Sequence, residues 1–253
     1  MGGAARIVAA LAALVVVVLA AGASRAEAPG DAPEAAARLD VLVINLNLSR
    51  GAVPAVDRLS EVLSRLAPGA RVEVAHFLDL DEAALKARAP RSVVLSPQSE
   101  PWWTYDAGDL GRLTGLIRGL DVPVLGVCGG HQLLAMAYGG EVAPIRDKAE
   151  GESYAGMFKE KGTISIRVER ADPLLAGIEV GAHRSVHAWH TEEIKRLPPG
   201  FVLLATGRVS RFQMIRHADR PLYGVQFHPE SSRATDPVNE RILLNFLRIA
   251  LGS

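Results

Sequence analysis

The sequence predicts an α/β protein with a mixed, mostly parallel central sheet flanked by helices. Between residues 39 and 138, apolar runs of strand length alternate with stretches whose apolar residues recur at helical spacing. Strands that are apolar on both faces are typical of a parallel sheet that is covered on both sides. Beyond Gly140 apolar and polar residues alternate, which indicates an antiparallel or mixed portion that continues the same sheet.

The first half of the chain predicts strands that are each followed by a helix. The first helix shows the pattern most clearly, because Val56, Leu59 and Val62 recur at the spacing of one helical face. The expected strands cover residues 39–46, 71–77, 92–95 and 122–127, and the expected helices cover residues 53–66, 82–88, 110–120 and 130–138.

The second half predicts shorter strands and one closing helix. Residues 163–168 and 212–217 alternate in polarity, whereas residues 201–205 and 222–227 are largely apolar. Residues 238–251 have the spacing of an amphipathic helix. No boundary separates these elements from the first half, so we expect a single domain over residues 39–253.

Composition narrows the classes of function. Of the 253 residues 49% are hydrophobic and 22% are charged, so a packed core is expected. Lys plus Arg and Asp plus Glu both number 28, and a chain without a basic excess is not expected to bind nucleic acid. A single cysteine excludes an intrachain disulfide and a cysteine-rich metal site. That cysteine is therefore either a buried structural thiol or a nucleophile.

Residues 1–26 have the organisation of a secretory signal peptide. The apolar run over residues 7–21 would extend about 22 Å as a helix, less than the roughly 30 Å hydrocarbon core of a membrane. Residues 27–38 are rich in Ala, Pro, Glu and Asp and are expected to form a linker. We expect export to the periplasm or the extracellular space. An uncleaved N-terminal membrane anchor and a misassigned start codon are the alternatives.

Cys128 follows the strand predicted over residues 122–127 and immediately precedes a predicted helix. It lies in the pattern Gly-x-Cys-x-Gly over residues 126–130, and these glycines permit the sharp turn of a nucleophile elbow. Sites in open α/β folds form at the carboxyl ends of the strands. The backbone N–H of Gly129 is expected to point to where an oxyanion develops. Taken alone, the segment also fits a structural cysteine in a strand–helix turn.

His228 and Glu230 follow the last predicted strand in the segment His-Pro-Glu. Residues two apart in an extended chain lie on the same side of a sheet, and Pro229 biases His228 toward extended conformations. A carboxylate beside an imidazole selects the tautomer and holds the ring, which is the task of the third member of a catalytic triad. We therefore predict Cys128 as the nucleophile, His228 as the base and Glu230 as the residue that orients the base.

These two segments resemble the motifs of the class I, or triad, glutamine amidotransferases. Residues 126–132 (GVCGGHQ) are similar to the nucleophile motif and residues 223–230 (YGVQFHPE) to the His/Glu motif, and the resemblance extends over residues 39–253. The form resembled is a free-standing amidotransferase domain of the GMP synthase type. The resemblance implies a flavodoxin-like sheet, attack of Cys128 on the side-chain amide of glutamine, and a substrate-holding role for Gln132.

The loop after the third predicted strand departs from the family pattern. The family carries a Gly-Gly pair in this oxyanion loop, whereas residues 95–101 of this chain read LSPQSEP. Pro97 has no N–H to donate, so the backbone amide of Gln98 is expected as the second oxyanion donor. Trp102 is expected to wall the mouth of the substrate pocket, with ordinary packing under the loop as the alternative.

No metal or other cofactor is expected. His183, His187 and His190 are spaced by four and three, which would suit ligands on one helical face, but the residues between them indicate a passage from loop to strand. A phosphate-binding Gly-x-x-x-x-Gly-Lys-Ser/Thr loop is absent from the sequence, which argues against ATP use.

The function expected is hydrolysis of the side-chain amide of glutamine, or of a γ-glutamyl compound, through a thioester intermediate. Two alternatives stay open. One is a glutaminase subunit that delivers ammonia to a separate synthetase partner. The other is a non-catalytic sensor module that keeps the pocket. No nucleic-acid partner is expected, and no membrane contact beyond the signal segment.

The signal segment gives a direct prediction. The mature protein should begin near Glu27 and lie outside the cytoplasm, because the apolar run ends at Ala21 and small residues that suit cleavage follow it. Intact mass measurement of the native protein, after fractionation of the cells that produce it, locates the first residue. Recovery of a chain that starts at Met1 from the soluble cytoplasmic fraction would refute the prediction.

Overall fold

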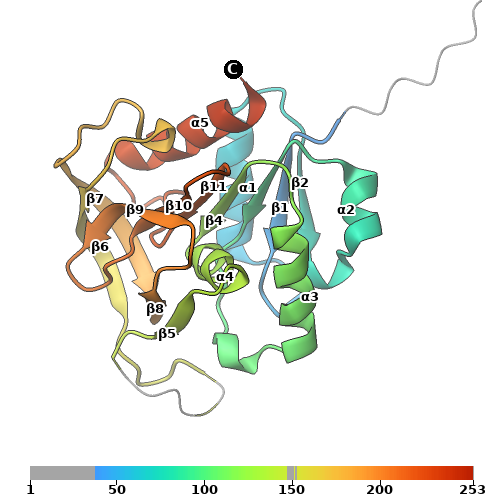
Figure 1. The fold of residues 1–253 in the computed structure, drawn as a ribbon, viewed down its shortest axis with the longest axis horizontal. Coiled ribbons are helices and arrows are strands. Elements are labelled where there is room, and N and C mark those ends of the chain that lie inside the picture. The colour runs from blue at the N-terminus through green and yellow to red at the C-terminus, as the bar shows by residue number, and fades with distance from the viewer. Residues whose placement is uncertain (1–37, 147–150, 152, 253) are drawn as a thin grey trace, which may run out of the picture. The chain divides into compact units, whose positions relative to one another are not determined.

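A nine-stranded sheet runs through the protein in the computed structural model, which describes residues 38–146, 151 and 153–252 (Figure 1). Its strand order is β2-β1-β3-β4-β11-β10-β9-β6-β7. The predicted signal segment, residues 1–26, and all but the last residue of the predicted linker, residues 27–38, lie outside the described residues. The prediction of a mixed, mostly parallel sheet flanked by helices is confirmed for the half that carries β1 to β4 and β11.

The parallel half is built from continuous apolar strands, as the sequence predicted. β1 (Val41–Asn45), β3 (Ser92–Leu95), β4 (Val124–Val127) and β11 (Leu222–Val225) are buried along their whole length, and β2 (Val72–His76) forms the outer edge. Each of the pairs β1–β2, β1–β3, β3–β4 and β4–β11 is parallel. Helices cover both faces of this half and leave no wet face for polar residues, which explains the absence of alternation.

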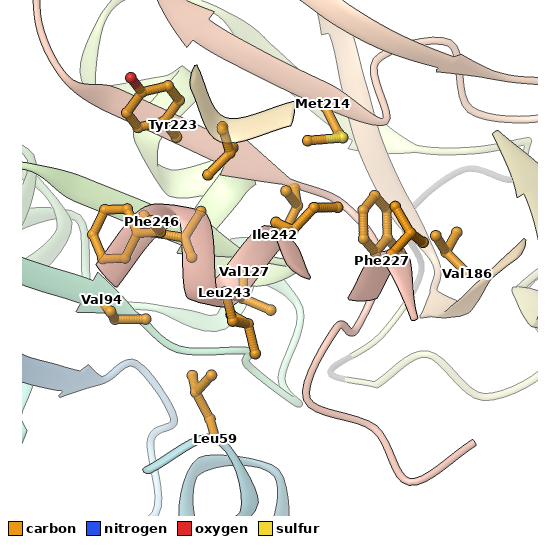
Figure 2. Close-up of a cluster of buried hydrophobic side chains, with 14 of the residues drawn as sticks. Leu59, Val94, Val127, Val186, Met214, Tyr223, Phe227, Ile242, Leu243 and Phe246 are labelled. Atoms are coloured by element: carbon orange, nitrogen blue, oxygen red, sulfur yellow. The ribbon is translucent and has the colours of Figure 1, made fainter. Parts of the chain in front are cut away.

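Alternate side chains of β1 enter two different apolar layers. Val41 and Val43 pack with α1 (Pro54–Leu66) and α5 (Val238–Leu251), whereas Leu42 and Ile44 pack on the side of α3 (Ala107–Arg118) and α4 (Gly129–Ala137). Figure 2 shows the first layer, where Leu59 of α1 and Phe246 of α5 meet strand residues such as Val127. The short α2 (Glu82–Arg88) adds Ala84 and Leu85 to the second layer.

The antiparallel half extends the sheet beyond β11. It consists of β10 (Met214–His217), β9 (Phe201–Gly207), β6 (Glu160–Val168) and β7 (His183–His190), and each neighbouring pair is antiparallel. A separate two-stranded sheet pairs β5 (Glu141–Pro144) with β8 (Glu192–Arg196). The expectation that this portion continues the main sheet is confirmed.

The strands that the sequence did not predict are polar ones. β5, β7 and β8 read EVAP, HRSVHAWH and EEIKR, without an apolar run to indicate them. Their pairing partners hold them extended, so tertiary context overrides weak local preference. Three 3₁₀ turns, η1 (Phe77–Asp79), η2 (Trp102–Thr104) and η3 (Pro173–Leu175), were likewise not predicted. None of the helices in the described residues is long and apolar enough to cross a membrane.

The helix α4 lies so close to the sheet that its glycines are a steric requirement. A Cβ atom on Gly130 would lie 2.3 Å from the backbone oxygen of Leu95 in β3, and one on Gly126 would lie 2.4 Å from the backbone of Gly130. Real Cβ atoms do not approach backbone this closely. The amide of Gly130 donates to the carbonyl of Ser96 at 3.0 Å, which fixes the helix against the end of β3.

A pair of glycine substitutions separates steric contact from helix propensity. Gly130→Ala should lower the free energy of unfolding by about 1–3 kcal/mol or more, because the methyl group forces α4 away from β3. Gly111→Ala is the matched control in α3, since open space surrounds that position. It should raise the free energy of unfolding by about 0.5–1 kcal/mol through helix propensity. Urea denaturation measures both; equal effects of the two substitutions would contradict the steric explanation.

Candidate active site

Cys128 occupies a strained turn between β4 and α4. Its φ is 50° and its ψ is −102°, a region that residues with a side chain rarely adopt. The turn is fixed on both sides, because the Cys128 amide donates to the carbonyl of Val225 at 2.8 Å and the Cys128 carbonyl accepts from Gln132 N at 3.2 Å. This geometry presents the thiol at the carboxyl end of the parallel strands and at the N-terminus of α4, as the elbow pattern predicted.

His228 and Glu230 meet through a turn rather than along a strand. Their side chains are in contact, with 2.8 Å between His228 Nδ1 and Glu230 Oε1. The predicted extended geometry through Pro229 is wrong, since β11 ends at Val225 and the amide of Ser231 donates to the carbonyl of His228 across a turn. Proline favours the second position of such a turn, because its φ is preset. The His228 amide also donates to the carbonyl of His187 at 2.8 Å, which ties the turn to β7.

The electrostatics of His228 favour the imidazolium form. Burial by itself lowers the pKa of His228, but the negative charges of a Cys128 thiolate and of Glu230 outweigh it and hold that pKa well above its usual value. Nε2 of His228 has no hydrogen-bond partner among the described residues, and His228 lines the same pocket as Cys128. The arrangement is that of a nucleophile beside a cationic imidazole whose far nitrogen is held by a carboxylate.

Two backbone amides lie beside each other next to the thiol. A Cβ atom on Gly129 would lie 2.9 Å from the amide nitrogen of Gln98, so the two residues are in close contact. Within the described part of the chain, neither amide donates to a protein acceptor. The loop that carries Gln98 is held from behind, because the carbonyl of Pro97 accepts hydrogen bonds from Asn47 Nδ2 at 3.1 Å and Ser96 Oγ at 2.7 Å. Proline at position 97 therefore leaves two amides for an oxyanion in this geometry.

A cavity of about 330 Å³ opens over Cys128. Several residues that the sequence did not single out form its walls. Besides Cys128, His228, Gln98 and Gln132, the lining includes Val53, Pro54, Ala55, Pro97, Ser99, Tyr154, Lys159, Trp189, His190, Thr191 and Glu192. They come from the start of α1, the loop after β3, and the segments around β6, β7 and β8. Because β7 and β8 carry no apolar signal, sequence reasoning had no basis for placing them at this site.

Trp102 does not lie where the sequence prediction placed it. It is buried, and its Nε1 donates to Oε1 of Gln132 at 2.8 Å, while the cavity lining among the described residues does not include it. The indole instead supports a wall residue from behind. Trp189 is the aromatic side chain at the cavity that stays exposed, and the Nζ of Lys159 lies 4.9 Å from the centre of its ring.

Gln132 is held on every side by the protein. Its Nε2 donates to the carbonyl of Glu192 at 2.6 Å and to Oε1 of Gln226 at 3.1 Å, and its Oε1 accepts from Trp102. The side chain therefore forms a rigid part of the cavity wall. His131, next to it in the chain, is fully buried on the other side of α4; its Nε2 lies 2.9 Å from the carbonyl of Phe212, and burial lowers its pKa to about 3. His131 is therefore neutral and structural.

The three histidines weighed as metal ligands lie on β7. In an extended strand the spacing of four and three places His183 and His187 on one face and His190 on the other. His190 is buried, with Nε2 3.0 Å from Glu160 Oε2 and Nδ1 2.9 Å from the carbonyl of Glu192. Among the residues that the structure describes, no group of His, Cys, Asp and Glu side chains is placed to hold a metal ion.

Comparison with known proteins points to one family. A family model described as Glutamine amidotransferase class-I matches residues 60–249. The glutamine-hydrolyzing subunit of GMP synthase from Methanosarcina mazei is 38% identical over 176 residues, which cover 68% of this chain and 85% of that protein. The protein of the same name from Methanothermobacter thermautotrophicus is 40% identical over 136 residues, which cover 54% of this chain and 65% of that protein.

Solved structures share the fold. A Thermoplasma acidophilum protein that is provisionally named as the same GMP synthase subunit superimposes with a TM-score of 0.67 at 24% identity, over 84% of this chain and 95% of that one. A glutamine amidotransferase from Thermotoga maritima superimposes with a TM-score of 0.61 at 15% identity, over 85% of this chain and 100% of that one. At these identities the likeness concerns the architecture alone.

The charge on His228 predicts how the single cysteine reacts. A thiol without a cationic neighbour is only about 0.3% ionised at pH 6. His228 stays protonated through neutral pH and loses its proton only as the pH rises through its raised pKa. His228→Asn should therefore slow alkylation of Cys128 by iodoacetamide at pH 6 by up to about 100-fold, and by much less above pH 9.

Mass spectrometry follows this reaction cleanly, because the chain contains one cysteine. The control is His183→Asn, which removes an exposed histidine of β7 and should leave the rate unchanged at both pH values. Equal alkylation rates of the unmodified protein and His228→Asn at pH 6 would contradict the ion pair.

Proposed function

The chain belongs to the class I glutamine amidotransferases, and on that premise we propose that it hydrolyses the side-chain amide of glutamine or of a γ-glutamyl compound. The observation that carries the proposal is the meeting of Cys128 at the strained elbow with His228, whose Nδ1 is 2.8 Å from Glu230. A nucleophile, a base and a residue that holds the base are the parts that acyl transfer requires.

The proposed reaction proceeds through a thioester. The Cys128 thiolate attacks the γ-carbonyl carbon, and the developing oxyanion accepts hydrogen bonds from the amides of Gly129 and Gln98. The C–N bond breaks as the His228 imidazolium gives its proton to the departing nitrogen, which leaves as ammonia. Neutral His228 then takes a proton from water, and the hydroxide attacks the thioester. The C–S bond breaks, glutamate is released, and the thiolate and imidazolium are restored.

A second candidate function follows from the relatives. The two described above are named as glutamine-hydrolyzing subunits of GMP synthase, and the match spans from 65% to 85% of their length. A chain of this kind would pass ammonia to a separate synthetase partner. The same thioester chemistry applies, but the rate of hydrolysis would depend on that partner.

Location separates the two candidates. The apolar segment over residues 7–21 supports our proposal that the protein is exported, where glutamine or a γ-glutamyl compound is hydrolysed as an end in itself. A glutaminase subunit would have to remain with the synthetase that consumes its ammonia.

Turnover by the purified chain is the test. It should release ammonia and glutamate from glutamine in equal amounts, and Cys128→Ala should reduce kcat by a factor of about 10⁴ or more. His228→Ala should cost nearly as much, and the double variant little more than either single one, because the members of a triad act as a unit.

Three other outcomes are informative. Multiplicative losses in the double variant, or an active Cys128→Ala protein, would refute the assigned roles. Hydrolysis that appears only after a synthetase partner is added would favour the second candidate. Glutamine binding by the unmodified protein with no turnover in either case would favour a sensor.

A further inference from the structure

The far wall of the cavity carries a buried carboxylate that has no cationic partner. Glu192 lines the cavity and is only 3% exposed, and among the described residues no Lys, Arg or His side chain forms an ion pair with it. Its Oε2 accepts from the hydroxyl of Tyr154 at 2.5 Å and from the backbone amide of Trp102 at 3.3 Å. Burial raises the pKa of Glu192, and the two donors only partly oppose it. A buried carboxylate in this setting would be stabilised by a cation in the cavity.

The surroundings of Glu192 hold it in one orientation. Gln98 Nε2 donates to the Tyr154 hydroxyl at 3.3 Å, and Gln132 Nε2 donates to the backbone carbonyl of Glu192 at 2.6 Å. Burial and the adjacent charge of Glu192 raise the pKa of Tyr154, so the phenol stays a donor. A preorganised carboxylate of this kind suits the recognition of one charged group of a ligand.

The opposite sign of charge lines the same cavity. Lys159 is the lysine of the lining, and within the described residues its ammonium contacts the Trp189 ring without an acidic partner. The same wall contains Thr191, which is 3% exposed and whose Oγ1 has no hydrogen-bond partner among the described residues. A buried hydroxyl without a partner costs free energy unless a ligand satisfies it.

We infer that Glu192 and Lys159 bind the α-ammonium and the α-carboxylate of the substrate, while Thr191 supplies a hydrogen bond to the same end. One cavity then holds a nucleophile for the γ-carbonyl and two opposite charges for an amino-acid head group. The substrate class is therefore a γ-glutamyl amide with an unblocked α-amino and α-carboxyl group, and it excludes internal glutamine residues of peptides. This inference rests on the proposed function and adds the residues that select its substrate.

Three ligands and two variants form a matched test. The ligands are L-glutamine, glutaramate, which lacks the α-amino group, and L-glutaminamide, which carries an α-carboxamide in place of the α-carboxylate. Their Kd values are measured by calorimetry on the full chain with Cys128→Ala, so that no turnover occurs. In that background Glu192→Gln should weaken glutamine binding about 10- to 100-fold and leave glutaramate nearly unchanged.

Lys159→Gln should show the reciprocal pattern, with a similar loss for glutamine and little change for L-glutaminamide. The controls remove the same charges nearby: Glu193→Gln, whose carboxylate pairs with Lys195, and Lys161→Gln, an exposed residue of β6. Neither lines the cavity as described, and both should bind all three ligands as the Cys128→Ala background does. Thermal denaturation of each variant checks that the fold is intact.

The outcomes separate this inference from the proposed function. If both variants weaken all three ligands by the same factor, or if the Cys128→Ala chain binds no glutamine, the assignment of Glu192 and Lys159 is wrong. If the reciprocal pattern holds but the unmodified chain hydrolyses nothing, the head-group assignment stands and the proposed hydrolysis fails. Tight binding of a peptide with an internal glutamine would also overturn the assignment.

Discussion

The close approach of α4 to the sheet is the constraint on which the site depends. Without side chains at Gly126 and Gly130, the backbone of the helix rests against the end of β3 and the start of its own turn. The chain must then reverse within one residue, and Cys128 takes the strained conformation at φ 50°. The strain costs on the order of 1–3 kcal/mol, and the packing of α4 on both sides of the turn maintains it. A side chain at either glycine would move the thiol away from His228 and from the amide of Gln98.

The same approach connects the two halves of the fold. α4 carries Gln132, whose amide reaches the carbonyl of Glu192 at the start of β8 and the side chain of Gln226 beyond β11. The parallel half supplies the nucleophile, and the antiparallel half supplies the wall opposite it. Hydrogen bonds between buried amides are directional, so they fix the spacing of the two halves more closely than apolar contact does.

Buried polar groups carry a large share of this wall. The pair His190–Glu160 lies under it, and Gln213 Nε2 also donates to Glu160 at 3.2 Å. Replacing one partner would leave a buried charge or dipole unpaired, which costs more than the contact itself contributes. Such a network keeps the backbone of residues 190–192 in place, and with it the carbonyl that holds Gln132. Rigidity of the cavity thus comes from residues that do not face it.

The sequence by itself determined the parallel core and the reacting residues. The limits of α2, β3 and α5 coincide with the predicted ranges, because continuous apolar runs and helical spacing reflect burial directly. Cys128, His228 and Glu230 were found because their chemistry and their flanking glycines and proline are local in the chain. The prediction of Gln98 as a neighbour of Gly129 followed from the missing N–H of Pro97.

Tertiary structure alone decided what surrounds these residues. Trp102 was predicted at the cavity mouth, but its indole finds its partner in Gln132, thirty residues away, and is buried there. β7 and β8 have polar sequences and become strands only because β6 and β5 pair with them. Lys159, Thr191 and Glu192 reach the cavity through that pairing, and no local pattern marks them. Side chains that act through burial and long-range partners leave no periodic signal, whereas those that act through a sharp turn do.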